Sequence, residues 1–390
     1  MLNDAPVPSA APPGPLLPVY PPFPVTPVSG RGCTLVDAEG REWLDFYGGH
    51  AVASTGHSHP RVVAAIAAQA AELLFYSSAV ALPIRERLAV ALAERLPAGL
   101  GRLFFCNSGA EANENALLLA RRATGRTAVL ALEGGFHGRT AATQAVTDGA
   151  RYERNARQAG LTPARKLPFG DLPALEAALD ESIAALILEP VQGMAGARSL
   201  GEDYLRAARS LCDAHGALLI FDEIQCGVGR TGAFTAAELF GVVPDLLTLA
   251  KGLAAGLPIG AVAANERAAA GLTYGDLGST FVGGPVVCAA ALANLEVISD
   301  EGLCERAAVA GRKLATDSRT VSGVVDVQGC GLLLGLRLDR PASSVQRALW
   351  GHRVLAGTAS DPAVLRLMPP LCVSDAELER FLEALRKVMS

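Results

Sequence analysis

Short apolar runs alternate with longer amphipathic stretches along most of the chain, beginning near residue 60. The runs are four to six residues long and rich in Val, Leu, Ile and Ala, which is typical of buried strands. The strand candidates are RLFF, TAVLAL, AALILE, ALLIFD, DLLTLA and GAVAA. Strands that alternate with helices form mainly parallel sheets covered on both faces, so the pattern predicts an α/β fold.

Both ends of the chain depart from this alternation. CTLVDAEGREWLDF predicts a hairpin around an Ala-Glu-Gly turn. Near the other end, a helix, the run VVDVQGCGLLLGLRL and the terminal helix DAELERFLEALRKVM are typical of a smaller α+β unit. We therefore predict an N-terminal arm and hairpin over 1–50 that joins the small domain, a large domain over 51–290 and a C-terminal small domain over 291–390.

The first thirty residues are rich in proline and contain no Lys or Arg. A secretory signal has a basic start and an unbroken apolar core, so we expect an extended, polyproline-like arm instead. The least polar segment elsewhere, LLTLAKGLAAGLPIGAVAA, carries a lysine, a proline and several glycines, which makes it poor material for a membrane span. We expect a soluble protein with no membrane partner.

Composition narrows the class of protein further. Half of the 390 residues are hydrophobic and 41 are glycine, as in a large globular α/β protein. The net charge of −5 provides no positive field for nucleic acid. The eight cysteines show neither a CxxC pair nor zinc-site spacing, which indicates reduced thiols and a cytoplasmic location.

The segment FFCNSGAEANENALLLARR predicts a helix that starts at a turn of small residues. Ser108 and Glu111 match a capping box, in which two side chains satisfy free amides at the start of a helix. Gly109 and Ala110 are too small to obstruct a ligand there, and a helix N-terminus favours an anion. On this motif alone, a plain capped helix remains the simpler interpretation. The predicted apolar stripe consists of Ala112, Ala116, Leu119 and Ala120.

Three further segments add candidate chemistry. EGGFHGRT places Phe136, His137 and Arg139 on a glycine-flanked loop, where a ligand can approach the backbone. ALLIFDEIQCG runs an apolar strand into Asp222, and burying a carboxylate is costly without a partner. Lys251 lies in an apolar, glycine-rich segment and is one of only four lysines, and desolvation would lower its pKa and free a neutral amine.

Together these residues match the needs of pyridoxal phosphate. That cofactor requires an amine, an anion cup for its phosphate, an acid beside its pyridine nitrogen and a flat surface against its ring. The chain offers Lys251, Asp222 and Phe136 for three of these tasks. Gly109 and Ala110 provide the anion cup.

Two other motifs are weaker. GVGRTG matches the spacing of a dinucleotide fingerprint, but five residues separate it from the preceding strand. GHSHP has no third metal ligand at a useful spacing, so hydrogen-bonded His57 and His59 in a turn are the better interpretation. We interpret Cys106 and Cys226, beside the candidate site, as packing residues.

Seven segments in the same order resemble the signatures of class III pyridoxal-phosphate aminotransferases, and most of all the acetylornithine and succinylornithine aminotransferase group. The resemblance covers the chain from about residue 20 to the C-terminus. It implies a fold-type I transferase with a mainly parallel seven-stranded sheet in the large, cofactor-binding domain, working as a homodimer with active sites at the subunit interface. The segments are FFCNSGAEANENA, FHGRT, EPVQG, FDEIQCGVGRTG, AKG, GSTF and LRLMPPL.

The resemblance also implies roles for residues around pyridoxal 5′-phosphate. Lys251 would carry the cofactor and later move the proton, and Asp222 would pair with the pyridinium nitrogen. Gln225 would hydrogen-bond the phenolic oxygen, and Phe136 would stack on the ring. Gly109 and Ala110 would bind the phosphate, with Thr280 reaching it from the other subunit. The implied substrate-binding residues are Arg139 and Ser279 for the α-carboxylate and Arg366 for the carboxylate of glutamate or 2-oxoglutarate.

The reaction implied by the resemblance is a ping-pong transfer in arginine biosynthesis. N-acetylornithine or N-succinylornithine gives its δ-amino group to the cofactor, and 2-oxoglutarate then takes it and leaves as glutamate. An ω-aminotransferase that uses ornithine, lysine or 4-aminobutyrate is the nearest alternative. A binding or scaffold protein on the same fold is a third, which the presence of both Lys251 and Asp222 disfavours.

The sequence departs from the family pattern at two places. Many relatives have E-P-x-Q-G-E-G-G, whereas this chain has EPVQGMAG, with Met194 where the second Glu shields the glutamate-binding arginine. Methionine cannot neutralise a guanidinium, so Arg366 should stand open in both half-reactions or find another acceptor, and the donor is in question. Relatives also have S-T-F-G-G-N-P, whereas Val282 and Gly284 alter that loop here. For Glu189, a structural carboxylate that ends a strand is at least as good an interpretation as a catalytic one.

Overall fold

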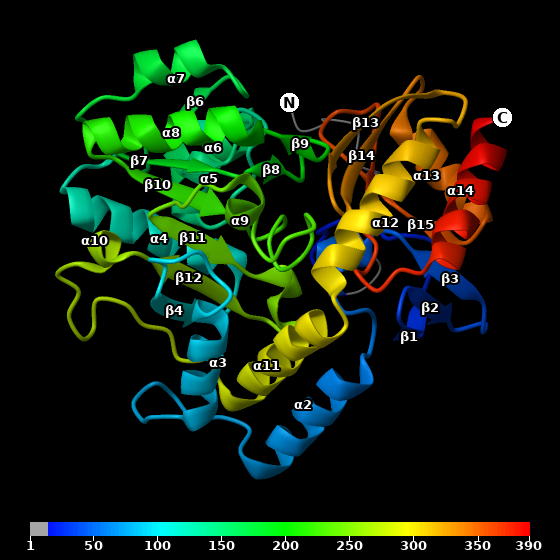
Figure 1. The fold of residues 1–390 in the computed structure, drawn as a ribbon, viewed down its shortest axis with the longest axis horizontal. Helices are drawn as coiled ribbons and strands as arrows, with labels where there is room; N and C mark the ends of the chain where they lie inside the picture. Colours follow the sequence, from blue (N-terminus) through cyan, green and yellow to red (C-terminus); the bar gives the residue numbers. More distant parts are fainter. Residues whose placement is uncertain (1–14) are drawn as a thin grey trace.

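A seven-stranded sheet forms the centre of the molecule, which a computed structural model describes over residues 15–390 (Figure 1). Its order is β4-β12-β11-β10-β7-β5-β6, and every neighbouring pair from β11 to β6 is parallel. β12 runs antiparallel to both β11 and β4. The strands are β4 (Arg102–Cys106), β5 (Ala128–Leu132), β6 (Arg165–Leu167), β7 (Ile183–Leu188), β10 (Leu218–Asp222), β11 (Leu246–Leu249) and β12 (Gly260–Ala264). The predicted α/β fold with a mainly parallel sheet is confirmed.

All six strand candidates lie in this sheet, and β6 is the strand that the hydrophobic pattern did not identify. It contains only Arg-Lys-Leu, so it has no apolar run, and it lies at one edge of the sheet beside β5. An edge strand is buried on fewer sides than a central one, so its sequence carries a weaker signal.

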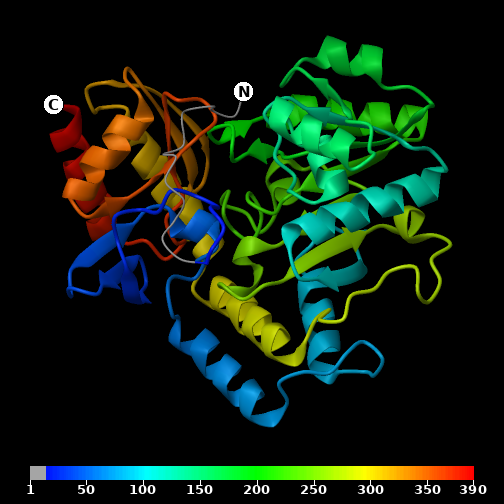
Figure 2. The same cartoon turned by 180° about the vertical axis from the view of Figure 1, so that it is seen from behind.

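Helices cover both faces of the sheet (Figures 1 and 2). α4 (Gly109–Thr124) packs against β10, β11 and β12, and α8 (Gly201–His215) packs against β7 and β10. The predicted stripe of α4 is buried at all four positions. The other helices in this part are α3 (Pro83–Ala93), α5 (Ala141–Val146), α6 (Ala150–Gln158), α7 (Leu172–Ala178), α9 (Ala236–Phe240), α10 (Glu266–Ala269) and the short 3-10 helix η1 (Lys251–Ala254), and β8 (Val191–Gln192) pairs with β9 (Arg198–Ser199).

The two ends of the chain meet beside this unit. The predicted hairpin is β2 (Thr34–Asp37) and β3 (Glu42–Asp45), and β3 pairs in parallel with β15 (Val354–Leu355). Residues 1–14 of the expected arm lie outside the described residues, and its last part forms the edge strand β1 (Pro27–Arg31). An edge position tolerates Pro27, which has no N–H to donate. A second sheet has the order β13-β14-β17-β16.

The remaining elements belong to the C-terminal part of the chain, except for α1 and α2, which follow the N-terminal hairpin. They are β13 (Val324–Cys330), β14 (Leu333–Leu338), β16 (Gly357–Thr358), β17 (Val364–Leu367), α1 (Gly48–Ala51), α2 (Pro60–Glu72), α11 (Pro285–Asp300), α12 (Leu303–Ser318), α13 (Ala342–Gly351) and α14 (Asp375–Met389). Within residues 15–390, no helix combines the length and the apolar character needed to cross a bilayer.

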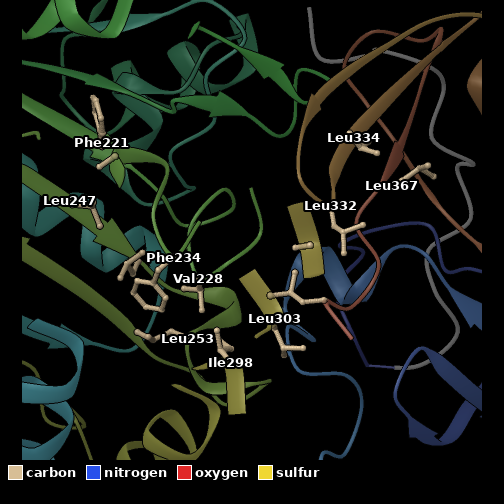
Figure 3. Close-up of a cluster of buried hydrophobic side chains, with 14 of the residues drawn as sticks. Phe221, Val228, Phe234, Leu247, Leu253, Ile298, Leu303, Leu332, Leu334 and Leu367 are labelled. Carbon is tan, nitrogen blue, oxygen red and sulfur yellow. The ribbon is translucent and has the colours of Figure 1, made fainter. Parts of the chain in front are cut away.

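One hydrophobic core continues from the large sheet into the C-terminal sheet (Figure 3). Phe221 and Leu247 on the large sheet belong to the same buried cluster as Ile298 on α11 and Leu334 and Leu367 on β14 and β17. Because apolar burial is the main stabilising term in folding, this shared core holds the C-terminal sheet beside the large sheet. The domain bounds at residues 50 and 290 stay a prediction, and α11 crosses the second of them.

Candidate active site

A cavity of about 390 Å³ lies where several parallel strands of the large sheet end. Ligands of open α/β sheets bind outside the carboxyl ends of the strands, because the loops diverge there. Phe136 follows β5, Glu189 follows β7, Asp222 ends β10 and Lys251 follows β11. All four side chains therefore reach the cavity from the carboxyl ends of the parallel strands. The predicted site residues that line it are Gly109, Ala110, Phe136, Asp222, Gln225 and Lys251.

Lys251 occupies an unusual backbone position at the start of η1. Its φ of 44° lies in the left-handed region, which costs a residue other than glycine on the order of 1–3 kcal/mol. Such strain persists only where the surrounding structure imposes it, and it is concentrated at functional sites. Burial lowers the pKa of Lys251, and the charge of Arg366 lowers it further, while Asp222 and Glu189 act in the opposite direction. The predicted lowering of this pKa by desolvation agrees with the structure.

Asp222 is held by a buried network of polar side chains. Its Oδ2 lies 2.8 Å from Nδ1 of His137 and accepts a 2.7 Å hydrogen bond from Nδ2 of Asn113. Oδ1 accepts from the backbone N–H of Ile224 at 3.1 Å. Asn113 is oriented in turn, because it donates to the carbonyl of His137 and accepts from Thr248 Oγ1, both at 2.8 Å. The buried carboxylate therefore has the partners that its burial requires.

Neither His137, which the sequence places on the site loop without a role, nor Asn113 is among the predicted site residues. A signal for Asn113 was present, since Asn113, Ala116, Leu117 and Ala120 follow helical spacing and all four are buried. A polar residue on an apolar helical stripe needs a buried partner.

The first turn of α4 borders the cavity. Ser108 is the N-cap, and its Oγ accepts from the backbone N–H of Glu111 at 3.2 Å, as predicted. The return bond differs from a standard capping box, because Oε2 of Glu111 accepts from the N–H of Asn107 at 2.7 Å. The first amides of a helix have no partner within it, so those of Gly109 and Ala110 can bind a ligand. A Cβ on Gly109 would lie 2.7 Å from the side chain of Ile224, which leaves no room for a larger residue.

Arg366 is a buried cation held by neutral acceptors. Its side chain is on β17, and its Nε donates to the carbonyl of Thr358 at 2.6 Å. Nη1 donates to the carbonyl of Gly193 at 3.2 Å and to Oε1 of Gln225 at 3.4 Å. Among residues 15–390 no carboxylate forms an ion pair with it, and burial lowers its pKa. Arg366 has therefore found other acceptors in place of the missing carboxylate, and Met194 lines the neighbouring cavity.

Glu189 joins two segments of the cavity wall. One carboxylate oxygen accepts from the N–H of Phe136 at 2.9 Å, and the other accepts from the N–H of Gly193 at 3.1 Å. Burial first, and the charge of Asp222 second, raise the pKa of Glu189 to about 7. These two bonds match the structural role considered for it, because they hold the loop of Phe136 and the segment that contacts Arg366.

Four predicted site residues do not line the cavity, and one of them is the buried Arg366, which lies behind Gln225. Arg139 is exposed, and its guanidinium carbon lies 5.1 Å from the ring centre of Tyr20 and 5.9 Å from that of Phe136. Ser279 borders the α4 turn, because its Oγ accepts from Nδ2 of Asn107 at 2.9 Å. Thr280 is exposed, and its predicted task concerns a second subunit.

The two weaker motifs and the two cysteines near the site have structural roles. GVGRTG lies in the loop between β10 and α9, and no helix starts directly after it. The imidazole of His57 lies 2.8 Å from Asp45, and that of His59 lies 3.1 Å from Glu301. The histidines are therefore hydrogen-bonded in a turn, as predicted. Cys106 and Cys226 are buried.

The cavity fits pyridoxal phosphate on its own chemistry. It brings together a buried amine, a carboxylate with fixed hydrogen-bond partners, the start of a helix built from small residues and an aromatic ring. Its volume lies within the usual range of about 300–1,000 Å³ for small-molecule sites.

Comparison with known proteins agrees with this chemistry. Residues 18–389 match the family model described as aminotransferase class-III. The chain is 42% identical over 388 residues to the acetylornithine aminotransferase of Methanocaldococcus jannaschii, covering 96% of each protein. It is 44% identical over 376 residues to the acetylornithine aminotransferase of Mycolicibacterium smegmatis, covering 94% of each. The crystal structure of ornithine aminotransferase from Toxoplasma gondii superposes with a TM-score of 0.87 at 32% identity, covering 94% of this chain and 91% of that one.

The match to the family model extends over nearly the whole chain, and the relatives match over nearly their whole length. The cavity supplies the residues that pyridoxal phosphate requires. The chain therefore belongs to the class III aminotransferases and is a pyridoxal-phosphate-dependent transaminase.

Proposed function

We propose that this enzyme transfers the δ-amino group of an N-acylornithine, N-acetylornithine or N-succinylornithine, to 2-oxoglutarate in arginine biosynthesis. The observation that carries the proposal concerns two buried cationic side chains. Arg366 is held by neutral acceptors, and it lies beside the cavity that Lys251 lines. Arg366 is suited to a dicarboxylate such as 2-oxoglutarate, because a guanidinium binds a carboxylate through two parallel hydrogen bonds. The names of the similar proteins support N-acetylornithine as the donor.

The residues of the cavity divide the work of holding the cofactor. Pyridoxal phosphate supplies an aldehyde that captures amines and a ring that accepts electrons when a C–H bond breaks. Lys251 Nζ would hold the cofactor and then move the proton at the reacting carbon, since its lowered pKa favours a neutral amine. Asp222 would keep a positive charge on the ring nitrogen, and Phe136 would support the ring face. Gly109 and Ala110 would donate their amides to the phosphate.

Substrate would be oriented by charged and polar groups around this centre. Gln225 would bind the phenolic oxygen of the cofactor while its Oε1 remains near Arg366. Arg139 would bind the α-carboxylate of the donor, with Ser279 nearby. Arg139 is exposed, lies near the rings of Tyr20 and Phe136, and forms no side-chain hydrogen bond or ion pair within residues 15–390, so it is free to turn toward a substrate.

A homodimer completes the proposed site. A cluster of exposed apolar side chains, the 73–76/281 cluster, consists of Leu73, Leu74, Phe75, Tyr76 and Phe281. The rings of Phe75 and Phe281 lie 5.0 Å apart, and Thr280 precedes Phe281 in the same exposed loop. Exposed apolar patches mark protein interfaces. A second copy seated there would bring Thr280 toward the phosphate of the partner.

The proposed location is the cytoplasm, and the free thiols are consistent with it.

The first test is a half-reaction without a keto acid. The cofactor-loaded enzyme is mixed separately with N-acetylornithine, N-succinylornithine, ornithine, lysine and 4-aminobutyrate, and its visible absorbance is followed. Rapid loss of absorbance with an acylated ornithine supports the proposal and identifies the donor. Loss with ornithine, lysine or 4-aminobutyrate alone would instead establish the second candidate, an ω-aminotransferase for another donor, which Met194 keeps open.

A further inference from the structure

Two thiols from opposite ends of the sequence meet at the junction of the chain termini. Cys33 lies between β1 and β2, and Cys372 lies between β17 and α14. Gly32, next to Cys33, exchanges two backbone hydrogen bonds with His57. A Cβ on Gly56 would lie 2.8 Å from the Cα of Gly32 and 2.9 Å from the sulfur of Cys372, so both segments pack against the same glycine. The two thiols interact with each other, and this interaction shifts the pKa of both.

The two thiols differ in exposure and in charge environment. Cys33 is buried, and Cys372 is partly exposed. The interaction with Cys33 and the guanidinium of Arg306 lower the pKa of Cys372, against the opposing effects of burial and of Glu377. The same interaction and burial raise the pKa of Cys33. Thiolates, not thiols, are the nucleophiles in cysteine oxidation, so Cys372 is the reactive member and Cys33 the second, buried one.

Cationic groups without carboxylate partners surround the pair. Arg306 donates through Nε and Nη2 to the carbonyl of Val373, next to Cys372, at 3.2 and 3.0 Å. Arg230 is buried, interacts electrostatically with both thiols, and donates through Nη1 to the carbonyls of Leu332 and Pro369. Its Nη2 has no hydrogen-bond partner among residues 15–390. These cations act against Glu377 and Asp45, and the balance favours negative charge on Cys372 rather than on Cys33.

We propose that Cys372 and Cys33 are an oxidation site that closes into an intramolecular disulfide on reaction with a hydroperoxide. The Cys372 thiolate attacks one peroxide oxygen, so that an S–O bond forms, the O–O bond breaks and the leaving oxygen departs as water or alcohol after protonation. The sulfur of Cys33 then attacks that of Cys372, forming the S–S bond and releasing the first oxygen as water. Two thiols are oxidised by two electrons, and one peroxide is reduced.

The disulfide would link residues near the two ends of the chain. A cross-link that closes so long a loop restricts the unfolded chain, so the oxidised protein should melt at a higher temperature than the reduced one. Neither cysteine lines the cavity, and the inference stands independently of the proposed donor.

A peptide map of the full-length, cofactor-loaded enzyme tests the proposal. The protein is exposed to hydrogen peroxide, alkylated in denaturant with N-ethylmaleimide and digested with trypsin without reduction. Cleavage after arginine gives the peptides 32–41 and 367–380, each with a single cysteine. The expected result is a linked pair of these peptides that dithiothreitol separates. Both peptides alkylated, Cys372 over-oxidised without a link, or either cysteine joined to another partner would overturn the proposal.

Variants separate the two roles. Cys33→Ser should stop the reaction at the sulfenic acid of Cys372, which dimedone traps on peptide 367–380. Cys372→Ser should leave Cys33 fully alkylated. Cys330→Ser, a matched control that removes another partly exposed thiol, should keep the cross-link. Should the buried Cys33→Ser variant not fold, the wild-type map decides the question by itself.

Discussion

Asn113 and His137 hold the carboxylate of Asp222 although neither belongs to the set of residues expected to touch the cofactor. Asp222 must keep a fixed direction if it is to pair with a ring nitrogen, and two short hydrogen bonds from packed side chains supply that direction. The residues that orient the acid therefore matter as much as the acid itself.

Replacing Asn113 with Ala should weaken cofactor binding. A hydrogen bond to a charged group contributes about 1.5–3 kcal/mol, so the dissociation constant of pyridoxal phosphate should rise by roughly tenfold or more. Titration of the apoenzyme with the cofactor, followed by absorbance, measures it. Asn115→Ala is the matched control, because Asn115 lies on the same helix and donates only to the carbonyl of Glu111. Equal constants for the two variants would exclude the orienting role.

Met194 is a second residue of interest. It lines the cavity, and Arg366 nearby has no carboxylate partner among residues 15–390. An open Arg366 can bind the distal carboxylate of N-succinylornithine, whereas the acetyl group of N-acetylornithine offers no charge. Met194→Glu should place a carboxylate near Arg366 and lower kcat/KM for N-succinylornithine relative to N-acetylornithine by about tenfold, since a like charge disfavours the donor's carboxylate.

Competing donor assays measure this ratio. Met194→Gln has the same side-chain length without the charge and should keep the wild-type preference. A ratio that is unchanged in Met194→Glu would show that Arg366 does not contact the acyl group of the donor.

Among the elements, the loop that follows β10 is anchored by Glu223 at the start of α9. Its two carboxylate oxygens accept from the backbone N–H groups of Ala236 and Ala237 at 2.5 and 2.7 Å. Burial nevertheless raises the pKa of Glu223 from 4.5 to about 8, against the effect of these amides. The folded protein therefore holds this proton at pH values where the unfolded chain has released it.

Glu223 should make folding stability fall with rising pH. Its contribution is fully present below pH 4.5, where both states are protonated, and is lost as the pH rises toward 8. Urea unfolding at fixed protein concentration from pH 5 to 8 should show a shallower decline for Glu223→Gln than for the wild type. Because every other group, including Glu189, is common to both proteins, the difference in slope isolates Glu223, and identical slopes would contradict its raised pKa.

At the scale of the whole molecule, the exposed 73–76/281 cluster and the adjacent Thr280 make the state of association a functional question. Phe281→Arg would place a charge in the proposed interface. Sedimentation should then show dissociation at protein concentrations where the wild type is dimeric, accompanied by weaker cofactor binding as Thr280 is withdrawn. Val325→Arg, which changes an exposed apolar residue on β13, should leave the dimer intact. A monomeric wild type would refute the proposed assembly.

Secondary-structure elements with a local signal could be predicted from the amino-acid sequence alone. Six strands of the large sheet, the hairpin at 34–45, the helix after Ser108 and the final helix each show their own periodicity or capping signal, because an element's buried face repeats with its own geometry. Lys251 and Asp222 were recognisable because a charge inside an apolar run needs a reason.

The contacts between residues that are distant in the sequence depend on how the elements pack. His137 and Asn113 reach Asp222 because the order of strands in the sheet brings β10, the loop after β5 and α4 together. Arg366 reaches Gln225 at the cavity wall because the shared core holds the C-terminal sheet beside the large one. Cys33 meets Cys372 for a similar reason, since β3 pairs with β15 near both chain ends. Local patterns carry no information about separations of this kind, because they are set by packing between elements.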